Sequence, residues 1–398
     1  MNLAKNRLTQ FVMKTSKLCN LRCKYCYEFE ELGKNSRMSL EQLKIAYKYI
    51  ADYYEALDKQ DNLNTEIRFI WHGGEPLLIE PSYYWQTFED QKAIFDGKFE
   101  ILNMVQTNLT VLGEERIELL KYGFDKVGVS IDIIGGLRVN IAGHDLQSKV
   151  LQNMDILNQA GVNFGCITVL TKNNIDKVTQ IFNFFKKSQT QFSFLPLFHG
   201  AYEDQHQNFE LSTQDILKAY QQLVDVWLQS EDFVSVLPIV DHIHRVLNYI
   251  LKNSPPTYFN KRLWNTTLLV NTNGDCYSYG DPYGEEEWTL GNIFTTSLNQ
   301  ILSGDRWEKS VLAAEERIAY NCLNCKYFGS CDGYAIAEDH SNCREVSTNG
   351  IRVCTLEKSL FEYIENRLKE VNLIDKDGSL KLTSKQAEKL GMNTKQIF

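Results

Sequence analysis

The sequence predicts an α/β fold in which a partial (β/α)6 barrel precedes a small cysteine-rich domain. Through the first 200 residues, short apolar runs alternate with amphipathic helical segments, which is the pattern of parallel βαβ units. Six such units are too few to close an eight-stranded barrel, so we expect a partial, TIM-like barrel. A second observation is that closely spaced cysteines occur near each end of the chain, which indicates metal or cluster sites.

The expected strands are apolar runs rich in β-branched and aromatic residues. The first helical pattern opens with Ser39 and Gln42, the spacing of a capping box. In barrels of this type, functional residues gather at the C-terminal ends of the strands, so the motifs there carry the most information. We expect strands at 8–15, 66–71, 100–107, 126–131, 163–170 and 191–198, and helices near 39–57, 82–95, 113–122, 148–160 and 175–187.

Two further helical patterns, 212–229 and 237–252, are predicted to bridge the barrel and the cysteine-rich region. His242 and His244 lie in the second pattern, but residues two apart point to different faces of a helix, so no ligand pair is expected. The resulting domains are the barrel at 1–200, the helical bridge at 201–262, the cysteine-rich domain at 263–373 and a polar tail at 374–398.

Composition and charge exclude several classes of protein. The net charge of −9 argues against nucleic acid as the main partner. No apolar run approaches the roughly 18 residues that a membrane-spanning helix needs. Because the N-terminus also lacks a signal-peptide pattern, we expect a cytoplasmic, reducing location in which cysteines stay as thiols.

Cys19, Cys23 and Cys26 follow the first strand at spacings of four and three residues. An iron–sulfur cluster of the cubane type usually takes four cysteine thiolates, so three thiolates leave one iron open, as catalytic metal sites keep an open position. A structural zinc site would need a fourth ligand nearby, and the next histidine is His72. A disulfide framework does not suit a chain of this size without a secretory signal. The spacing therefore predicts an open iron–sulfur cluster.

The CxxxCxxC pattern followed by Tyr27 resembles the cluster motif of the radical S-adenosylmethionine (SAM) superfamily. The resemblance implies that the open iron of a [4Fe-4S] cluster binds the amino and carboxylate groups of S-adenosylmethionine. It further implies that reductive cleavage of this cofactor yields a 5′-deoxyadenosyl radical, which takes a hydrogen atom from a substrate. In such enzymes the cofactor carries the difficult step, and the protein supplies orientation and exclusion of water.

The motif WHGGEPLL ends the second expected strand. Its two glycines permit a close backbone approach, and the carboxylate of Glu75 can accept hydrogen bonds from a cationic amine. The resemblance implies that Gly73, Gly74 and Glu75 contact the amino group of S-adenosylmethionine.

The fourth expected strand ends in the motif GVSID. The resemblance implies that Ser130 and Asp132 approach the carboxylate or ribose of the cofactor. Arg138 follows in the next loop and is expected to pair with the cofactor carboxylate. Residues 106–108 end the third strand and are expected to line the same cavity. Cys166 lies within an apolar strand, where a buried and inert thiol is expected.

The C-terminal region contains Cys322, Cys325 and Cys331, followed by Cys343 and Cys354. Three of these cysteines and one later cysteine can close a four-thiolate site. From the ligands alone, the site can hold either an iron–sulfur cluster or zinc.

A second resemblance concerns this region. The hairpin with an Asn273-Gly274 turn, the following TLGNI and the cysteine string resemble the SPASM extension of peptide-modifying radical SAM enzymes, which commonly carries two auxiliary clusters. That pattern has cysteines where this chain has Tyr279 and Ala335, so the first auxiliary cluster is predicted to be absent and Cys276 to be an unligated thiol. The resemblance assigns one auxiliary [4Fe-4S] cluster to Cys322, Cys325, Cys331 and Cys354, with Cys343 as the alternative fourth ligand.

Both resemblances imply an enzyme that modifies peptides or proteins. HGGEPLL after an aromatic residue is similar to maturases of ribosomally made peptides, so the first expectation is an intramolecular crosslink of the cyclophane type in a precursor peptide. The alternatives are a sulfatase maturase that makes formylglycine, or a maturase that forms thioethers or epimerises residues. Asp281 follows the hairpin near the place where sulfatase maturases have a proton-accepting aspartate, with one residue inserted, and is the catalytic candidate. A non-enzymatic iron–sulfur or zinc protein would need no GGE motif.

The N-terminal segment carries only basic charge, because no acidic residue occurs from Met1 to Tyr27. Complementary charge steers the encounter of electron-transfer partners, so this segment predicts a docking face for an acidic flavodoxin or ferredoxin. The alternative is ordinary solvated charge that also supports the cofactor carboxylate. The basic residues are Lys5, Arg7, Lys14, Lys17, Arg22 and Lys24.

Overall fold

The computed structural model describes residues 6–197, 207–231, 234–252, 254–263, 266–279, 283–338 and 345–374. The contacts within the chain form two compact units that interleave along the sequence. The four successive segments expected above remain a prediction. The first unit comprises residues 1–165, 198–207 and 260–314, and the second comprises 166–197, 208–259 and 315–398.

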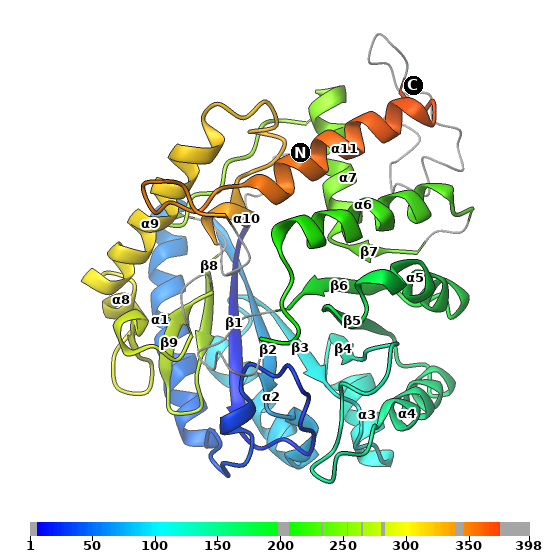
Figure 1. The fold of residues 1–398 in the computed structure, drawn as a ribbon. Helices are drawn as coiled ribbons and strands as arrows, with labels where there is room; N and C mark the ends of the chain where they lie inside the picture. Colours follow the sequence, from blue (N-terminus) through cyan, green and yellow to red (C-terminus); the bar gives the residue numbers. More distant parts are fainter. Residues whose placement is uncertain are drawn as a thin grey trace. The chain divides into compact units, whose positions relative to one another are not determined.

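The sheet of the first unit has four parallel strands at its centre, joined in the order β1–β2–β3–β4 (Figure 1). Each strand is followed by a helix, as the alternating pattern predicts. The strands are β1 (Asn6–Ser16), β2 (Asn64–Gly73), β3 (Glu100–Thr107) and β4 (Lys126–Ser130). The helices are α1 (Leu40–Asp61), α2 (Pro81–Phe95), α3 (Glu114–Tyr122) and α4 (Gln147–Gln159).

The odd-numbered residues of β2 face the helices. The ring of Phe69 lies 5.2 Å from that of Tyr47 on α1, and the ring of Trp71 lies 5.6 Å from that of Tyr84 on α2. Because side chains alternate along a strand, His72 lies on the opposite face of the sheet. The register places Lys14 of β1 directly beside His72. This second face carries the polar residues considered below.

The predicted hairpin is present, and it extends the same sheet. Strand β8 (Thr266–Val270) pairs antiparallel with β9 (Asp275–Ser278) and parallel with β1, so that Thr266 stands beside Thr9. The turn needs glycine: Gly274 has φ +93°, and a Cβ atom there would lie 2.4 Å from the ring of Phe294. β10 (Gly291–Asn292), α8 (Leu298–Ile301) and α9 (Asp305–Cys322) follow.

The second unit contains three parallel strands and the helices that pack on one another around α11. The ring of His242 on α7 lies 5.2 Å from that of Phe361 on α11, and Arg367 of α11 donates to Asp225 of α6 at 2.7 Å. Its strands are β5 (Phe164–Leu170), β6 (Phe192–Pro196) and β7 (Val236–Leu237). Its helices are α5 (Val178–Lys187), α6 (Thr213–Gln229), α7 (Ile239–Leu251), α10 (Tyr334–Ala337) and α11 (Thr355–Glu370).

The element positions agree with those expected from the sequence, and the α/β fold is confirmed. The capping box at Ser39 and Gln42 is formed at the start of α1. α1 runs four residues further than expected because Asn62 ends it in a left-handed conformation, with φ 57°. Cys166 is buried on β5, as expected. Within the described residues, none of the helices is long and apolar enough to cross a membrane.

Candidate active site

The loop that carries Cys19, Cys23 and Cys26 follows β1 and is hydrogen-bonded to the segment after β4. The Arg22 N–H donates to the carbonyl of Val139 at 2.7 Å, and the Lys24 N–H donates to that of Leu137 at 2.9 Å. Cys19 and Cys23 are buried, and Cys26 is half-buried. The three thiols thus lie on a loop whose backbone is fixed by hydrogen bonds to the segment after β4.

Hydrogen-bond donors lie close to two of these sulfurs. The Leu21 N–H lies 3.4 Å from Cys19 Sγ and the Asn108 amide lies 3.8 Å from it, while the Arg138 guanidinium lies 3.9 Å from Cys23 Sγ. Such donors orient cysteine ligands and tune a cluster.

Burial is the main reason why the pKa of the Cys19 thiol and that of the Cys26 thiol rise to about 12, and the neighbouring cysteines add to the shift. A thiolate in this loop therefore needs a positive partner, which iron supplies. Three thiols that share one buried environment, with donors beside their sulfurs, fit the predicted cluster. Among the described residues, no three cysteine, histidine or acidic side chains are arranged to hold a single metal ion.

The two glycines of WHGGEPLL allow the end of β2 and the segment after β1 to approach each other closely. A Cβ atom on Gly73 would lie 2.3 Å from the carbonyl oxygen of Ser16, and one on Gly74 would lie 2.3 Å from that of Leu18. Main-chain hydrogen bonds join the same segments, from Gly74 to Ser16 at 2.7 Å and from Glu75 to Leu18 at 2.9 Å. The two glycines thus let the end of β2 lie against the start of the cysteine loop. Their contact with the cofactor remains a prediction.

Glu75 is 1% exposed, and its carboxylate joins the ends of β2 and β3. It accepts hydrogen bonds from the hydroxyl of Thr107 at 2.6 Å and from the N–H groups of Asn108 at 2.7 Å and Leu77 at 2.9 Å. Burial raises the pKa of Glu75 above its usual value, and these hydrogen bonds offset only part of that rise. A carboxylate offers about four lone-pair sites, so the three bonds leave one for a further donor such as an ammonium group.

Asp132 and Arg138 form a buried ion pair. The Arg138 Nε lies 3.0 Å from an oxygen of Asp132, and the hydroxyl of Tyr25 donates to the same oxygen. Burial alone would lower the pKa of Arg138, but the Asp132 carboxylate raises it, so the guanidinium remains charged. Ser130 accepts a hydrogen bond from the Gln106 amide at 2.7 Å. The structure therefore gives Arg138 a partner within the chain and connects it to the cysteine loop through Tyr25.

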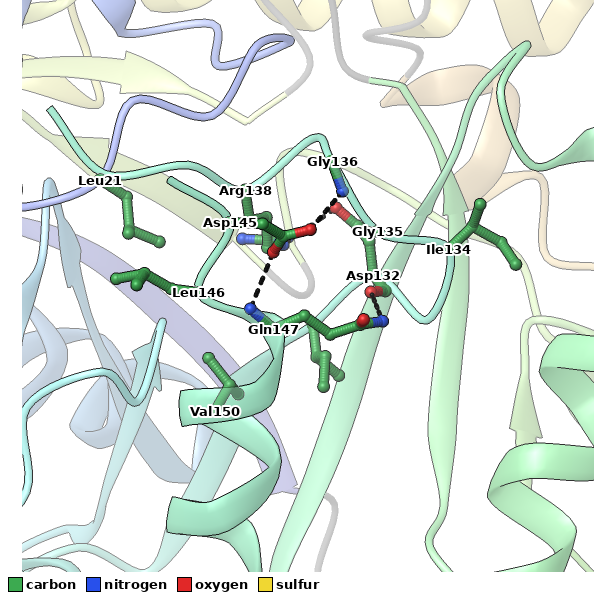
Figure 2. Close-up of a pocket in the computed structure, with 11 residues that line it drawn as sticks. Leu21, Asp132, Ile134, Gly135, Gly136, Arg138, Asp145, Leu146, Gln147 and Val150 are labelled. Atoms are coloured by element: carbon green, nitrogen blue, oxygen red, sulfur yellow. Dashed lines mark hydrogen bonds and ion pairs between the residues drawn. The ribbon is translucent and has the colours of Figure 1, made fainter. Parts of the chain in front are cut away.

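A small cavity lies beside this ion pair, lined by Leu21 of the cysteine loop and by the loop after β4 (Figure 2). Figure 2 shows the carboxylate of Asp145 turned towards the N–H groups of Gly136 and Gln147, and it accepts a hydrogen bond from each. The Gln147 amide donates to the carbonyl of Asp132 at 2.9 Å. These hydrogen bonds fix the conformation of the loop after β4 where it lines the cavity. Tyr25, Asp145 and Gln147 were not predicted from the sequence, and only the position of Tyr25 between Cys23 and Cys26 could have indicated a role.

Lys14, which was predicted to belong to the basic docking face, lies in a cluster of buried polar residues at the end of β1. Lys14 is 2% exposed, with Nζ 3.2 Å from Glu28 and 3.4 Å from His72 Nδ1, and Tyr283 donates to Glu28 at 3.1 Å. Burial is the main cause that lowers the pKa of His72 to about 3, and Lys14 adds to it. Lys14 therefore cannot belong to an exposed basic face.

Arg7 is excluded from the docking face for the same reason. It is 4% exposed and ion-paired with Asp58 and Asp61. Lys17 pairs with Glu31. Arg7 and Lys14 both lie on β1, and the burial of this strand removes these two cations from the surface, which the sequence alone does not show. Lys24 is exposed, Arg22 is half-buried, and Lys5 lies outside the described residues.

The second cysteine set lies in the second unit. Cys322 ends α9, and Cys325 and Cys331 follow on a tight loop. Burial is the main cause that raises the pKa of Cys322 to about 12, and electrostatic repulsion from Cys331 and Cys325 adds to the shift. Cys354 is held near the end of α9 because its N–H donates to the Asn321 side chain at 2.8 Å. The structure thus brings four of the predicted auxiliary ligands to one region. Cys343 and Asp281 lie outside the described residues.

The predicted unligated thiol, Cys276, is fully buried on β9, with Sγ 3.6 Å from the carbonyl of Gly274. Tyr279, just after β9, and Ala335, within α10, stand where the SPASM pattern has cysteines. These positions supply no thiolate.

Residues 13–185 match the family described as the Radical SAM superfamily. The matched segment contains the three-cysteine loop, the GGE motif and the Asp132–Arg138 pair. This segment is a radical SAM domain. A [4Fe-4S] cluster and S-adenosylmethionine are the cofactors of this superfamily, so these two cofactors, expected from the sequence, are confirmed.

Among curated proteins, the chain is similar to the cysteine-type anaerobic sulfatase-maturating enzyme of Clostridium perfringens (strain 13 / Type A). The two are 25% identical over 372 residues, which cover 91% of this chain and 97% of the relative. The serine-type anaerobic sulfatase-maturating enzyme of Bacteroides thetaiotaomicron is 25% identical over 338 residues, or 79% of each chain.

Two solved structures share the fold. The structure of anSMEcpe with bound AdoMet and the Cp18Cys peptide has a TM-score of 0.69 and 23% identity, covering 92% of this chain and 99% of that one. Streptococcus suis SuiB bound to the precursor peptide SuiA has a TM-score of 0.52 and 14% identity, covering 84% and 75%. These likenesses confirm the partial barrel with a C-terminal extension.

Proposed function

We propose that this chain is a maturase that oxidises a cysteine or serine side chain within a protein or peptide to formylglycine. The observation that carries the proposal is the extent of the likeness to sulfatase-maturating enzymes, which spans 91% of this chain and 97% of the Clostridium perfringens relative. The likeness therefore includes the C-terminal region as well as the barrel. It supports the formylglycine alternative of the sequence analysis better than the crosslink expected first.

The residues of the first unit have separable roles under this proposal. Cys19, Cys23 and Cys26 would hold the [4Fe-4S] cluster. With S-adenosylmethionine bound, this centre supplies the 5′-deoxyadenosyl radical that takes a hydrogen atom from the substrate carbon. Glu75 would use its remaining lone pair for the cofactor ammonium, because its other contacts fix it in place. Gly73 and Gly74 would keep the chain close enough for that contact.

Asp132 and Arg138 would act mainly by positioning. Their ion pair and Tyr25 connect the loop after β4 to the cysteine loop, so they would fix the thiols relative to the cavity. Ser130, oriented by Gln106, would face the cofactor from the end of β4. The second unit would hold one auxiliary [4Fe-4S] cluster on Cys322, Cys325, Cys331 and Cys354.

A crosslink-forming peptide maturase is the second candidate. Tyr279 and Ala335 replace two cysteines of the first auxiliary site, and the fold is shared with SuiB, whose structure contains a precursor peptide. This chain would then carry one auxiliary cluster, whereas the SPASM resemblance implies two.

Product analysis distinguishes the two candidates. The reconstituted and reduced enzyme is incubated with S-adenosylmethionine and peptides that carry a sulfatase-type cysteine or serine, and aldehydes are captured with a hydrazide before mass spectrometry. We expect an aldehyde product together with 5′-deoxyadenosine. A product that has lost two hydrogens without forming a carbonyl would overturn formylglycine formation and support a crosslink. The Cys23→Ala variant should form neither product.

A further inference from the structure

Arg245 places a positive charge beside one cysteine of the auxiliary set. It lies on α7, and its guanidinium is 3.3 Å from Cys331 Sγ and 2.7 Å from an oxygen of Asp332. The Arg245 side chain is 30% exposed and that of Asp332 is 27% exposed, so both are partly shielded from water. All three residues belong to the second unit.

A related arrangement occurs at the first cysteine set. There, Arg138 pairs with Asp132 and reaches Cys23 Sγ at 3.9 Å. In both places an aspartate pairs with an arginine that also reaches a cysteine sulfur: Arg138 uses Nε for the aspartate and Nη1 for the sulfur, whereas Arg245 uses Nη1 for both. Arg245 is the closer of the two to its sulfur by 0.6 Å, from 3.9 and 3.3 Å.

A charged donor beside a ligand sulfur has a definite electrostatic effect. A cluster becomes more negative when it takes up an electron, and hydrogen bonds to its sulfurs are one of the levers that set its reduction potential. A bond from an ionised donor is roughly twice as strong as a neutral one. A guanidinium next to Cys331 therefore stabilises the reduced cluster more than the oxidised cluster.

Two other charged residues in the described part of the unit act differently from Arg245. Glu357 has a carboxylate oxygen 3.3 Å from Cys354 Sγ, which would disfavour the reduced cluster when ionised. Arg317 on α9 donates to the main-chain carbonyls of Ile336 at 3.0 Å and of Ala337, and so holds α10 in place. Arg245 is thus suited to offset negative charge at the site.

We propose that Arg245 raises the reduction potential of the auxiliary cluster through its hydrogen bond to Cys331, so that the oxidised cluster readily takes up one electron. The cluster gains one electron and no proton, and the substrate that loses the electron is oxidised. The inference rests on the auxiliary cluster of the proposed function, but its test needs neither substrate nor turnover. Arg245 is a positioning and tuning residue, since it touches a ligand and not the reacting atoms.

The test is a redox titration of the full chain in which Cys19, Cys23 and Cys26 are changed to alanine, so that only the auxiliary cluster contributes. The reduced cluster is followed by electron paramagnetic resonance. Relative to this background, Arg245→Gln should lower the ratio of reduced to oxidised cluster about tenfold at a given potential, a shift of about 59 mV for one electron. Arg245→Lys should fall between the two, because it keeps the charge but loses the planar fork.

Two further variants separate tuning from structural support. Arg317→Gln removes an arginine of the same unit that binds main-chain carbonyls, and it should leave the potential unchanged. Asp332→Asn should shift the potential upward, since it removes a negative charge and releases the guanidinium to Cys331. This opposite sign keeps the inference testable if Arg245→Gln fails to fold.

Three outcomes would overturn the inference. An unchanged potential in Arg245→Gln, with only a lower unfolding midpoint, would make Arg245 a structural ion pair. A downward shift in Asp332→Asn would contradict the assigned direction. If the background protein binds zinc or no iron, there is no cluster to tune and the auxiliary part of the proposed function falls with the inference. If the cluster is bound but its reduction potential is the same in Arg245→Gln, the inference is wrong and the proposed function is unaffected.

Discussion

Asp132 holds two groups that the cysteine loop depends on, the Arg138 guanidinium and the Tyr25 hydroxyl. The side chains of Asp132 and Arg138 are only 2% and 13% exposed. Removing one partner of a buried ion pair leaves the other charge uncompensated, at a cost of about 3–5 kcal/mol. Asp132→Asn should therefore lower the free energy of unfolding of the cluster-free chain by about 3 kcal/mol, measured by urea denaturation.

A matched control is Asp176→Asn, which breaks an exposed pair with Lys177 whose side chains are 66% and 46% exposed. Exposed pairs contribute little because water screens them, so little change is expected there. An equally small loss in Asp132→Asn would show that the ion pair does not brace the cysteine loop.

At the scale of elements, α1 depends on its N-terminal cap. The Ser39 hydroxyl accepts from the Gln42 N–H at 3.2 Å, and the Gln42 side chain accepts from the Ser39 N–H at 2.8 Å. Ser39→Ala leaves the Gln42 N–H without its acceptor and should lower stability by about 1 kcal/mol in urea denaturation. Ser36→Ala, at an exposed position just before the helix, is the control and should have almost no effect. Equal effects of the two changes would argue against the cap.

α11 is joined to the loop of the auxiliary cysteines through Glu365. Burial raises the pKa of Glu365, but hydrogen bonds from Lys326, Lys369 and Tyr327 outweigh it and lower the pKa to about 2. A carboxyl whose pKa is lowered on folding stabilises the fold above its unfolded pKa of about 4.3, and this contribution is lost as the pH falls towards the folded pKa.

The comparison of wild type with Glu365→Gln tests this contribution. The variant should be less stable by about 1 kcal/mol between pH 6 and pH 8, since charged hydrogen bonds at a partly exposed site are lost. The difference in urea midpoint should shrink as the pH is lowered from about 4 towards 2. A difference that grows with acidification would have the wrong sign.

At the scale of the whole molecule, iron content tests the two cysteine sets together. Two cubane clusters require about eight irons per chain. Changing Cys322 and Cys331 to alanine should leave about four irons and preserve reductive cleavage of S-adenosylmethionine. Changing Cys19, Cys23 and Cys26 instead should also leave about four irons but abolish that cleavage. About four irons plus one zinc in the wild type would contradict the auxiliary assignment.

The periodicity of the chain was sufficient to locate its elements. The predicted strand at 100–107 coincides with β3, and the predicted helix at 113–122 begins one residue before α3. Side chains repeat every two residues in strands and every 3.6 residues in helices, and these repeats are local. The three-cysteine motif is equally local, which is why its chemistry could be recognised without a structure.

Burial of charge could not be read from the sequence. Lys14 lies in an apolar strand and was assigned to a basic docking face, yet β2 places His72 beside it and the cysteine loop places Glu28 at its ammonium group. Arg138, which was expected to bind the cofactor, is likewise buried and paired with Asp132, and its contact with the cofactor stays a prediction. Both outcomes depend on which loops meet at the end of the sheet.

The sequence by itself determined the element order, the spacing of three cysteines on one loop and the resemblance of the barrel region to the radical SAM superfamily, because these features are encoded along the chain. Only the tertiary structure decided that β8 pairs with β1, at a separation of 257 residues between Thr9 and Thr266, and that Arg245 reaches Cys331, 86 residues away. The physical reason is that sheet register and helix packing bring distant residues together, and electrostatic effects depend on those distances in space rather than along the chain.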